Sequence, residues 1–219
     1  MMTTQTTSTI SQQIDSLCAR NPIIPVIVVE QAEQILPLAR ALQAGGITIL
    51  EITLRSDAAL DAIALAKNEL EGITVGAGTV VNEKQMDQVL AAGAEFIVTP
   101  GLSVDLLKSA KSRNVPFLPG VATVSEIIMG LDAGFDRFKF FPAEAAGGLP
   151  FIKSLHGPFS QVRFCPTGGI GLHNYLDYLK QPNIMAVGGS WVVPNDAVKQ
   201  GDWERITEIT RSSLVPLQK

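Results

Sequence analysis

Residues 25–46 read PVIVVEQAEQILPLARALQAGG and contain one complete strand–helix unit. The unbroken apolar run 25–29 is typical of a strand that is buried on both faces of a parallel sheet. Apolar residues at helical spacing follow over 31–44, and Gly45-Gly46 ends that helix. The stretch therefore predicts a βα unit whose strand lies in the core and whose helix covers it.

The same pattern recurs eight times at a nearly regular interval, with no linker or change of composition between units. A short amphipathic helix is expected over 10–18, and residues 1–9 are a candidate disordered tail. The expected strands are 25–29, 47–53, 73–78, 96–99, 116–120, 138–141, 162–165 and 184–187, and the expected helices are 31–44, 57–70, 82–92, 104–111, 125–133, 149–155, 172–179 and 202–214. Eight units predict an α/β fold, a single closed (β/α)8 TIM barrel over residues 1–219. An open doubly wound sheet is less suitable, because no GxGxxG turn follows the first strand.

Composition excludes several classes of protein. Hydrophobic residues make up 46% of the chain and charged residues 17%, which excludes a disordered chain. The net charge of −4, without any basic run, argues against a partner that is nucleic acid or an anionic membrane. The N-terminus lacks the features of a signal peptide, and no apolar run reaches the roughly 18 residues that a membrane span needs. Two distant cysteines, Cys18 and Cys165, fit a reducing compartment, so we expect a soluble cytoplasmic protein.

The sixth expected strand places one lysine among phenylalanines. Side chains alternate along a strand, so Lys139 shares a face with Phe141, while Phe138 and Phe140 face the helices. Burial disfavours the ammonium form, so Lys139 could attack a carbonyl carbon as a free amine and form a Schiff base, with Phe141 helping to keep the amine uncharged. A solvated or ion-paired lysine at a strand end is the structural alternative.

Two further charged residues belong to the second expected strand and its end. Glu51 is an acid within an apolar strand, a position that is costly unless the acid is paired or functional. It could shuttle protons for imine and carbon–carbon bond chemistry, or form a structural ion pair with Lys139 or Arg137. Arg55 follows the strand and has the planar fork that binds a carboxylate, unless it is a solvated loop residue.

Glycine-rich turns follow three of the expected strands. Gly76-Ala77-Gly78-Thr79 ends the third strand and is a weak signal by itself. Thr167-Gly168-Gly169 follows the seventh strand and Gly188-Gly189-Ser190 the eighth, where many barrels bind phosphate through backbone N–H groups. Tight turn geometry alone is the alternative.

The histidines do not predict a metal site. His156 and His173 lie outside the important strand ends and have no clustered ligand spacing. Cys165 falls within a strand and is expected to be a small core residue.

Five motifs, taken together, resemble the 2-keto-3-deoxy-6-phosphogluconate (KDPG) and 4-hydroxy-2-oxoglutarate (KHG) aldolases, class I aldolases that include an enzyme of the Entner–Doudoroff pathway. The motifs are EITLR (51–55), VGAGT (75–79), FKFFPAE (138–144), RFCPTGGI (163–170) and GGSW (188–191). The resemblance extends from Pro25 to Thr207.

The resemblance implies a role for each matching residue. Lys139 corresponds to the Schiff-base lysine and Glu51 to the general acid and base. The carboxylate-binding positions are Arg55 and Thr79, the phosphate-binding positions are Gly168, Gly169, Gly189 and Ser190, and the pocket is expected to include Thr167, Phe141 and Pro100.

The resemblance also implies a carbon–carbon lyase that uses no metal or organic cofactor and assembles as a homotrimer. Its substrates would be KDPG, cleaved to pyruvate and glyceraldehyde 3-phosphate, and KHG, cleaved to pyruvate and glyoxylate. A sugar-phosphate isomerase or epimerase and a non-catalytic phosphometabolite sensor are the other readings, and the presence of both Lys139 and Glu51 argues against the sensor. The sequence leaves the stereospecificity at C4 open.

Overall fold

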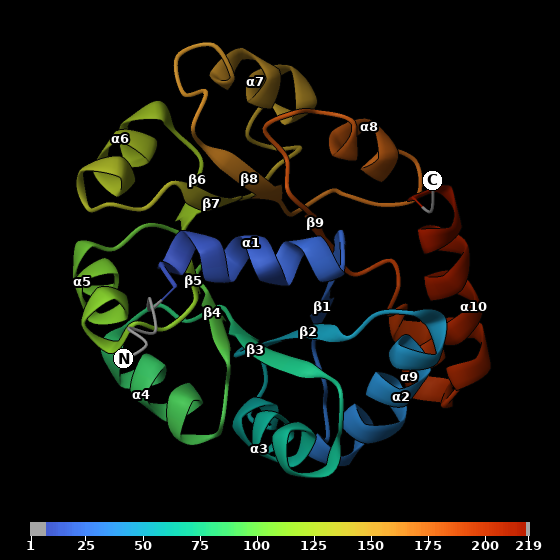
Figure 1. Ribbon diagram of the computed structural model, residues 1–219. Helices are drawn as coiled ribbons and strands as arrows, with labels where there is room; N and C mark the ends of the chain where they lie inside the picture. The colour runs from blue at the N-terminus through green and yellow to red at the C-terminus, as the bar shows by residue number, and fades with distance from the viewer. Residues whose placement is uncertain (1–7, 218–219) are drawn as a thin grey trace, which may run out of the picture.

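Short parallel strands alternate with helices along the chain. The structure is a computed structural model that describes residues 8–217. The strands are β1 (Ile23–Ile27), β2 (Ile49–Thr53), β3 (Thr74–Gly78), β4 (Phe96–Val98), β5 (Phe117–Leu118), β6 (Gly120–Val121), β7 (Arg137–Phe140), β8 (Arg163–Pro166) and β9 (Val187–Gly189). The helices are α1 (Ile10–Arg20), α2 (Ile35–Gly45), α3 (Ala59–Glu69), α4 (Glu83–Ala91), α5 (Val104–Arg113), α6 (Val124–Asp132), α7 (Gly148–Leu155), α8 (Tyr175–Leu179), α9 (Asn195–Gln200) and α10 (Trp203–Leu214), with 3-10 turns η1 (Ala32–Gln34) and η2 (Val215–Leu217). Figure 1 shows the helices in a ring around the strands, with α1 lying across them.

The strands do not form the closed eight-stranded barrel that the sequence predicts. Hydrogen-bonded ladders join six strands in the order β5-β4-β3-β2-β1-β9 and three strands in the order β6-β7-β8. Every ladder is parallel. The α/β class is therefore correct, and the closed (β/α)8 TIM barrel is wrong.

Two prolines mark the breaks between the sheets. Pro119 separates β5, which pairs with β4, from β6, which pairs with β7. At the other break, the backbone N–H of Phe164 donates to the carbonyl of Asn183, in the segment that precedes β9. Pro166 lies two residues further along the same strand edge and has no N–H with which to continue the ladder. Isolated bridges, one of them Thr167↔Gly188, connect these segments instead.

Helix α1 covers the end of the sheets where β7 begins. The guanidinium of Arg137 donates to both carboxylate oxygens of Asp15 on α1, at 2.7 and 2.8 Å. Arg137 therefore pairs with α1 and not with Glu51, so one of the two structural alternatives for Glu51 does not hold. Burial, with a contribution from Asp15, raises the pKa of the Cys18 thiol on α1 to about 12. Cys18 packs near Cys165, which is a buried core residue as predicted.

Alternation along the strands divides the buried side chains into two clusters. The inner cluster lies between the strands and α1 and consists of Ile14, Cys18, Ile24, Ile49, Phe96, Val98, Leu118, Cys165 and Ala186. The outer cluster lies under the helices and includes Phe138 and Phe140, as predicted. Phe140 stacks on Phe151 of α7, with 5.5 Å between the ring centroids. Lys139, between these two phenylalanines, consequently points to the opposite side of β7, away from the helices.

Several boundaries differ from those predicted. Helix α9 was not predicted, and β9 begins at Val187, near the end of the strand expected over 184–187. Helix α6 begins with a capping box, in which the side chains of Thr123 and Glu126 each accept a hydrogen bond from the backbone N–H of the other residue. Residues 1–7 of the predicted disordered tail lie outside the described residues, whereas Thr9 caps α1.

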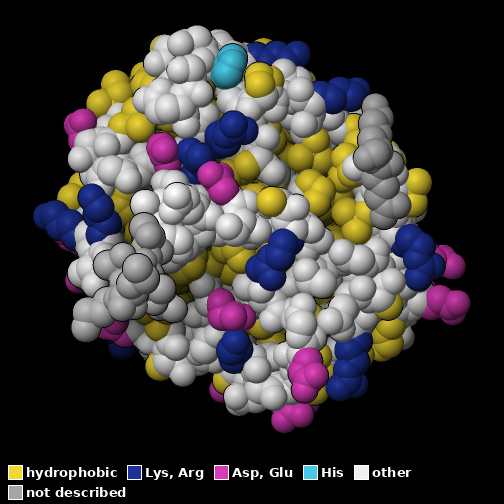
Figure 2. Space-filling model, in the orientation of Figure 1, with side chains coloured by type: hydrophobic (Ala, Val, Ile, Leu, Met, Phe, Trp, Pro, Cys, Tyr) yellow, Lys and Arg dark blue, Asp and Glu magenta, His cyan; other side chains and the backbone are white. Residues whose placement is uncertain are grey.

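The face that carries α1 shows Lys, Arg, Asp and Glu side chains of both signs scattered over it (Figure 2). No helix within residues 8–217 combines the length and the apolar character that crossing a membrane requires.

Candidate active site

Lys139 and Glu51 are the only charged residues that are buried within residues 8–217. They lie 88 positions apart in sequence, on β7 and β2, yet Lys139 Nζ is 3.2 Å from Glu51 Oε1. Their side chains are only 6% and 3% exposed. Desolvating two charges costs about as much as their attraction returns, so a buried pair is weak evidence of a stabilising role. The arrangement instead suits chemistry, because it brings an amine and a carboxylate within proton-transfer distance in a buried site.

Glycine at position 78 makes room for the Glu51 carboxylate. Strands β2 and β3 run side by side, and Gly78 lies opposite Thr53 in their ladder. A Cβ atom on Gly78 would lie 2.2 Å from Oε1 and 2.8 Å from Cγ of Glu51. In the sequence alone, the glycines of this turn are a weak signal. They do not reveal that the Glu51 carboxylate requires a residue without a side chain at position 78.

One predicted pocket residue lies beside the lysine, and another packs against the strand paired with it. Lys139 Nζ lies 5.2 Å from the centre of the Phe141 ring. On the other side, Gly120 of β6 is paired with Lys139. A Cβ on Gly120 would lie 2.4 Å from the carbonyl carbon of Pro100, so the Pro100 main chain packs directly against this ladder.

The two glycine turns at the ends of β8 and β9 meet. The bridge Thr167↔Gly188 joins turn 167–169 to turn 188–190. The contact is close, because a Cβ on Gly188 would lie 2.2 Å from Thr167 Oγ1. Within residues 8–217, no protein group accepts a hydrogen bond from the backbone N–H of Gly168 or Gly169. Adjacent N–H groups without a protein acceptor are suited to an anion.

Three residues of the predicted site have left-handed backbone conformations. Gly168 and Gly169 have φ angles of 97° and 78°, which glycine adopts without steric cost. Thr79 has a φ angle of 63°, although its β-branched side chain disfavours this region by about 1–2 kcal/mol. Strain of this kind is concentrated at functional sites, and Thr79 directly follows β3, the strand that accommodates Glu51.

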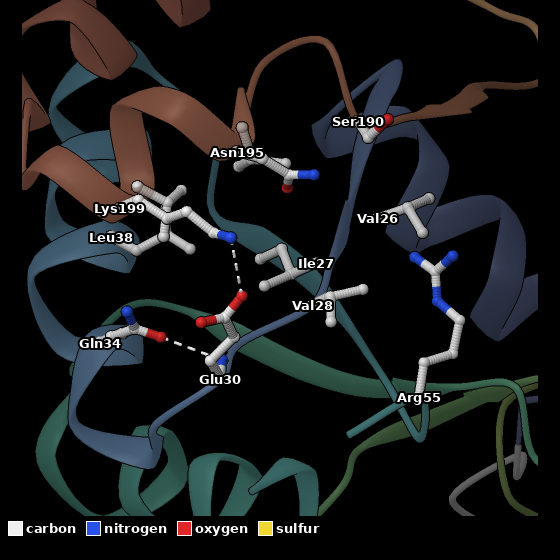
Figure 3. A pocket seen from close by; sticks show the side chains of 12 residues that line it. Val26, Ile27, Val28, Glu30, Gln34, Leu38, Arg55, Ser190, Asn195 and Lys199 are labelled. Carbon is white, nitrogen blue, oxygen red and sulfur yellow. Dashed lines mark hydrogen bonds and ion pairs between the residues drawn. The ribbon is translucent and has the colours of Figure 1, made fainter. Parts of the chain in front are cut away.

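Arg55 and Ser190 line a cavity that the buried pair does not line. This cavity of about 290 Å³ lies at the end of β1, and Figure 3 shows it from close by. Arg55 Nε donates to Thr53 Oγ1 at 3.1 Å. Among the described residues, neither Lys139 nor Glu51 lines this cavity or forms a hydrogen bond with Arg55.

Helix α9 also borders this cavity, and sequence reasoning missed its contribution. Asn195 and Lys199 line the cavity together with Arg55, and Lys199 pairs with Glu30, another lining residue, at 3.1 Å (Figure 3). Nowhere in the described chain do three His, Cys, Asp or Glu side chains converge in a way that could hold a metal ion.

Comparisons with known proteins agree with the motifs. A family model described as KDPG and KHG aldolase matches residues 14–209. The KHG/KDPG aldolase of Escherichia coli (strain K12) is 49% identical over 200 residues, which cover 91% of this chain and 94% of the relative. A structure of KDPG aldolase from Legionella pneumophila, with pyruvate captured at low pH as a covalent carbinolamine intermediate, is similar with a TM-score of 0.89 and 48% identity, covering 90% of this chain and 96% of that chain. The 2-keto-3-deoxy-6-phosphogluconate aldolase of Zymomonas mobilis ZM4, with 3-phosphoglycerate, has a TM-score of 0.83 and 47% identity, covering 92% of this chain and 98% of that chain.

Proposed function

This chain belongs to the KDPG and KHG aldolase family, and we propose that it is a class I aldolase that cleaves KDPG to pyruvate and glyceraldehyde 3-phosphate. The observation that carries the proposal is the buried pair of Lys139 and Glu51, with 3.2 Å between amine and carboxylate. The covalent carbinolamine of the Legionella relative is the adduct that an amine forms with a ketone, which supports the same chemistry for Lys139. Cleavage of KHG to pyruvate and glyoxylate is proposed as a second reaction, supported by the name of the Escherichia coli relative.

In the first half of the reaction, Lys139 acts as the nucleophile. Its amine attacks the C2 ketone, and the addition product is a carbinolamine. Loss of water gives an iminium, which withdraws electrons from the C3–C4 bond. Glu51 lies close enough to Nζ to give and take the protons that addition and dehydration require.

In the second half, Glu51 acts on the carbon chain. Through a water molecule it removes the proton of the C4 hydroxyl while the C3–C4 bond breaks, and the electron pair moves to the iminium nitrogen to give an enamine. The aldehyde leaves, and Glu51 returns a proton to C3. Water then hydrolyses the iminium, which releases pyruvate and restores the Lys139 amine.

The two ends of the substrate are assigned to different groups. Arg55, whose Nε is fixed by Thr53, and Thr79 would hold the pyruvate carboxylate. Turns 167–169 and 188–190 would hold the phosphate, since Gly168 and Gly169 present N–H groups with no acceptor among the described residues.

Pyruvate release tests the proposed activity. We expect the protein to release pyruvate from KDPG and from KHG, and the same assay with the C4 epimer of KDPG measures the stereospecificity at C4. A rate with KDPG that does not exceed the uncatalysed rate would contradict the proposal.

Gly78→Ala is expected to lower turnover by about 100-fold. The added methyl would overlap the Glu51 carboxylate, and a displacement of about 1 Å at a catalytic group is sufficient for a loss of this size. Gly157→Ala is the matched control, because an added Cβ there meets no atom within 4 Å. Steady-state pyruvate release measures the activity of both variants. Full activity in Gly78→Ala would show that turnover does not depend on the position of the Glu51 carboxylate.

We further propose a homotrimer located in the cytoplasm. Val104 on α5 and Met129 on α6 are exposed and flank an apolar groove that another copy of the chain could cover. The thiols Cys18 and Cys165 are unpaired, which fits a reducing compartment. Sedimentation equilibrium tests the assembly, and the mass of a single chain would contradict it.

A further inference from the structure

The segment that follows β7 runs behind the glycine turn at the end of β8. The backbone N–H of Ala143 donates to the carbonyl of Thr167 at 2.8 Å, and that of Glu144 donates to the carbonyl of Gly168 at 3.1 Å. A Cβ on Gly169 would lie 2.6 Å from Glu144 Cγ. The stem of Glu144 therefore packs directly against the second glycine, and the conformation of the turn depends on where this side chain lies.

Tyr178 of α8 holds the Glu144 carboxylate from inside the protein. Its side chain is 1% exposed, and its hydroxyl donates to Glu144 Oε1. Burial and the hydrogen bond to Glu144 raise the pKa of Tyr178 above its usual range, so the phenol keeps its proton. A neutral, buried donor thus fixes one oxygen of a carboxylate whose stem supports the turn.

Another hydrogen bond of turn 167–169 involves a carbonyl group and not the N–H groups of Gly168 and Gly169. Asn174 Nδ2 donates to the carbonyl of Gly169 at 3.1 Å. The carbonyls of Thr167, Gly168 and Gly169 are therefore all engaged by protein groups. By contrast, the N–H groups of Gly168 and Gly169 meet no acceptor in the described chain. Because protein groups hold the carbonyls on one side of the turn, the N–H groups of Gly168 and Gly169 are oriented toward the other side.

We propose that Tyr178 and Glu144 form a positioning pair that orients the N–H groups of Gly168 and Gly169 toward the phosphate of the substrate. The inference rests on the proposed function, because it assigns the turn to a phosphorylated substrate. Both residues act through the turn and not through contact with the reacting atoms. Their loss should accordingly affect the phosphorylated substrate selectively.

Tyr178→Phe tests the pair, because it removes the hydroxyl and keeps the buried ring. We expect kcat/KM for KDPG to fall about tenfold, mainly through KM, which is the effect of losing one hydrogen bond to a charged group. Cleavage of KHG, which has no phosphate, and exchange of the pyruvate methyl protons with solvent should be unchanged. Tyr175→Phe is the matched control, since Tyr175 lies on the same helix and donates from a buried site to the Ser213 carbonyl at 3.1 Å.

Two substitutions of the partner give the same test without altering the core, because Glu144 is exposed. Glu144→Gln keeps an oxygen that accepts from Tyr178 and should stay close to the unmodified protein. Glu144→Met has a similar length but no acceptor, and should show the selective loss of Tyr178→Phe. Equal losses with KDPG and KHG, or no loss in either Tyr178→Phe or Glu144→Met, would overturn the positioning role.

A readout without turnover separates this inference from the proposed activity. Inorganic phosphate can be titrated into the protein while the amide signals of Gly168 and Gly169 are followed by NMR. Binding should weaken about tenfold in Tyr178→Phe and remain unchanged in Tyr175→Phe. Equal phosphate affinity in all three proteins would overturn the pair, whereas phosphate binding without cleavage of KDPG would overturn the activity alone.

Discussion

Lys139→Met is expected to abolish pyruvate release from KDPG and KHG while the fold persists. Methionine cannot form an imine, and loss of a covalent nucleophile lowers kcat by a factor on the order of 10⁶. Its length and apolar character suit a side chain that is only 6% exposed. Pyruvate release measures the loss, and circular dichroism with thermal unfolding checks the fold.

Two control variants distinguish loss of the nucleophile from other effects of Lys139→Met. Lys153→Met makes the same substitution at an exposed position on α7 and should retain full activity. Lys139→Arg keeps a cation next to Glu51 but also forms no imine, so it should be inactive as well. If either variant of Lys139 retained more than about a tenth of the activity, Lys139 would not be the nucleophile.

Glu51→Gln is expected to lower kcat for KDPG by a factor of about 10² to 10⁴, which is the usual contribution of a general acid or base. The amide has the same shape as the carboxylate, and Lys139 remains able to react with the ketone. Proton transfer to and from the carbon chain should therefore be impaired, while trapping of pyruvate on Lys139 still occurs.

The comparison that isolates this effect is Glu71→Gln, at an exposed position. It should have normal kcat. Exchange of the pyruvate methyl protons with solvent should fall together with kcat in Glu51→Gln, because both need a proton at C3. An unchanged exchange rate would assign the proton transfer to another group.

The alternation of side chains on β7 could be predicted from the sequence, but the closure of the sheet could not. Phe138 and Phe140 pack under the helices as expected, because the period of a strand fixes which residues share a face. The closed barrel was wrong because counting apolar runs does not reveal which strand edges can bond. The strand expected over 116–120 contains Pro119, and the sheet breaks there.

In the candidate site too, features that depend on neighbouring residues could be predicted, whereas contacts between distant segments could not. Lys139 and Glu51 could be identified one at a time, because a charged residue within an apolar strand is unusual. The sequence allowed Glu51 to pair with either Lys139 or Arg137, and only the structure shows that the partner is Lys139, 88 positions away. The contact between Tyr178 and Glu144 joins a helix to a loop, and no local pattern encodes it.

Trapping of the imine is the most direct test of the claim that Lys139 is the nucleophile. The protein would be incubated with pyruvate, reduced with sodium borohydride, digested and mapped by mass spectrometry. We predict a single reduced pyruvate adduct, on the peptide that contains Lys139, and no adduct in Lys139→Met. The absence of an adduct from the unmodified protein, or an adduct on a different lysine, would contradict the account.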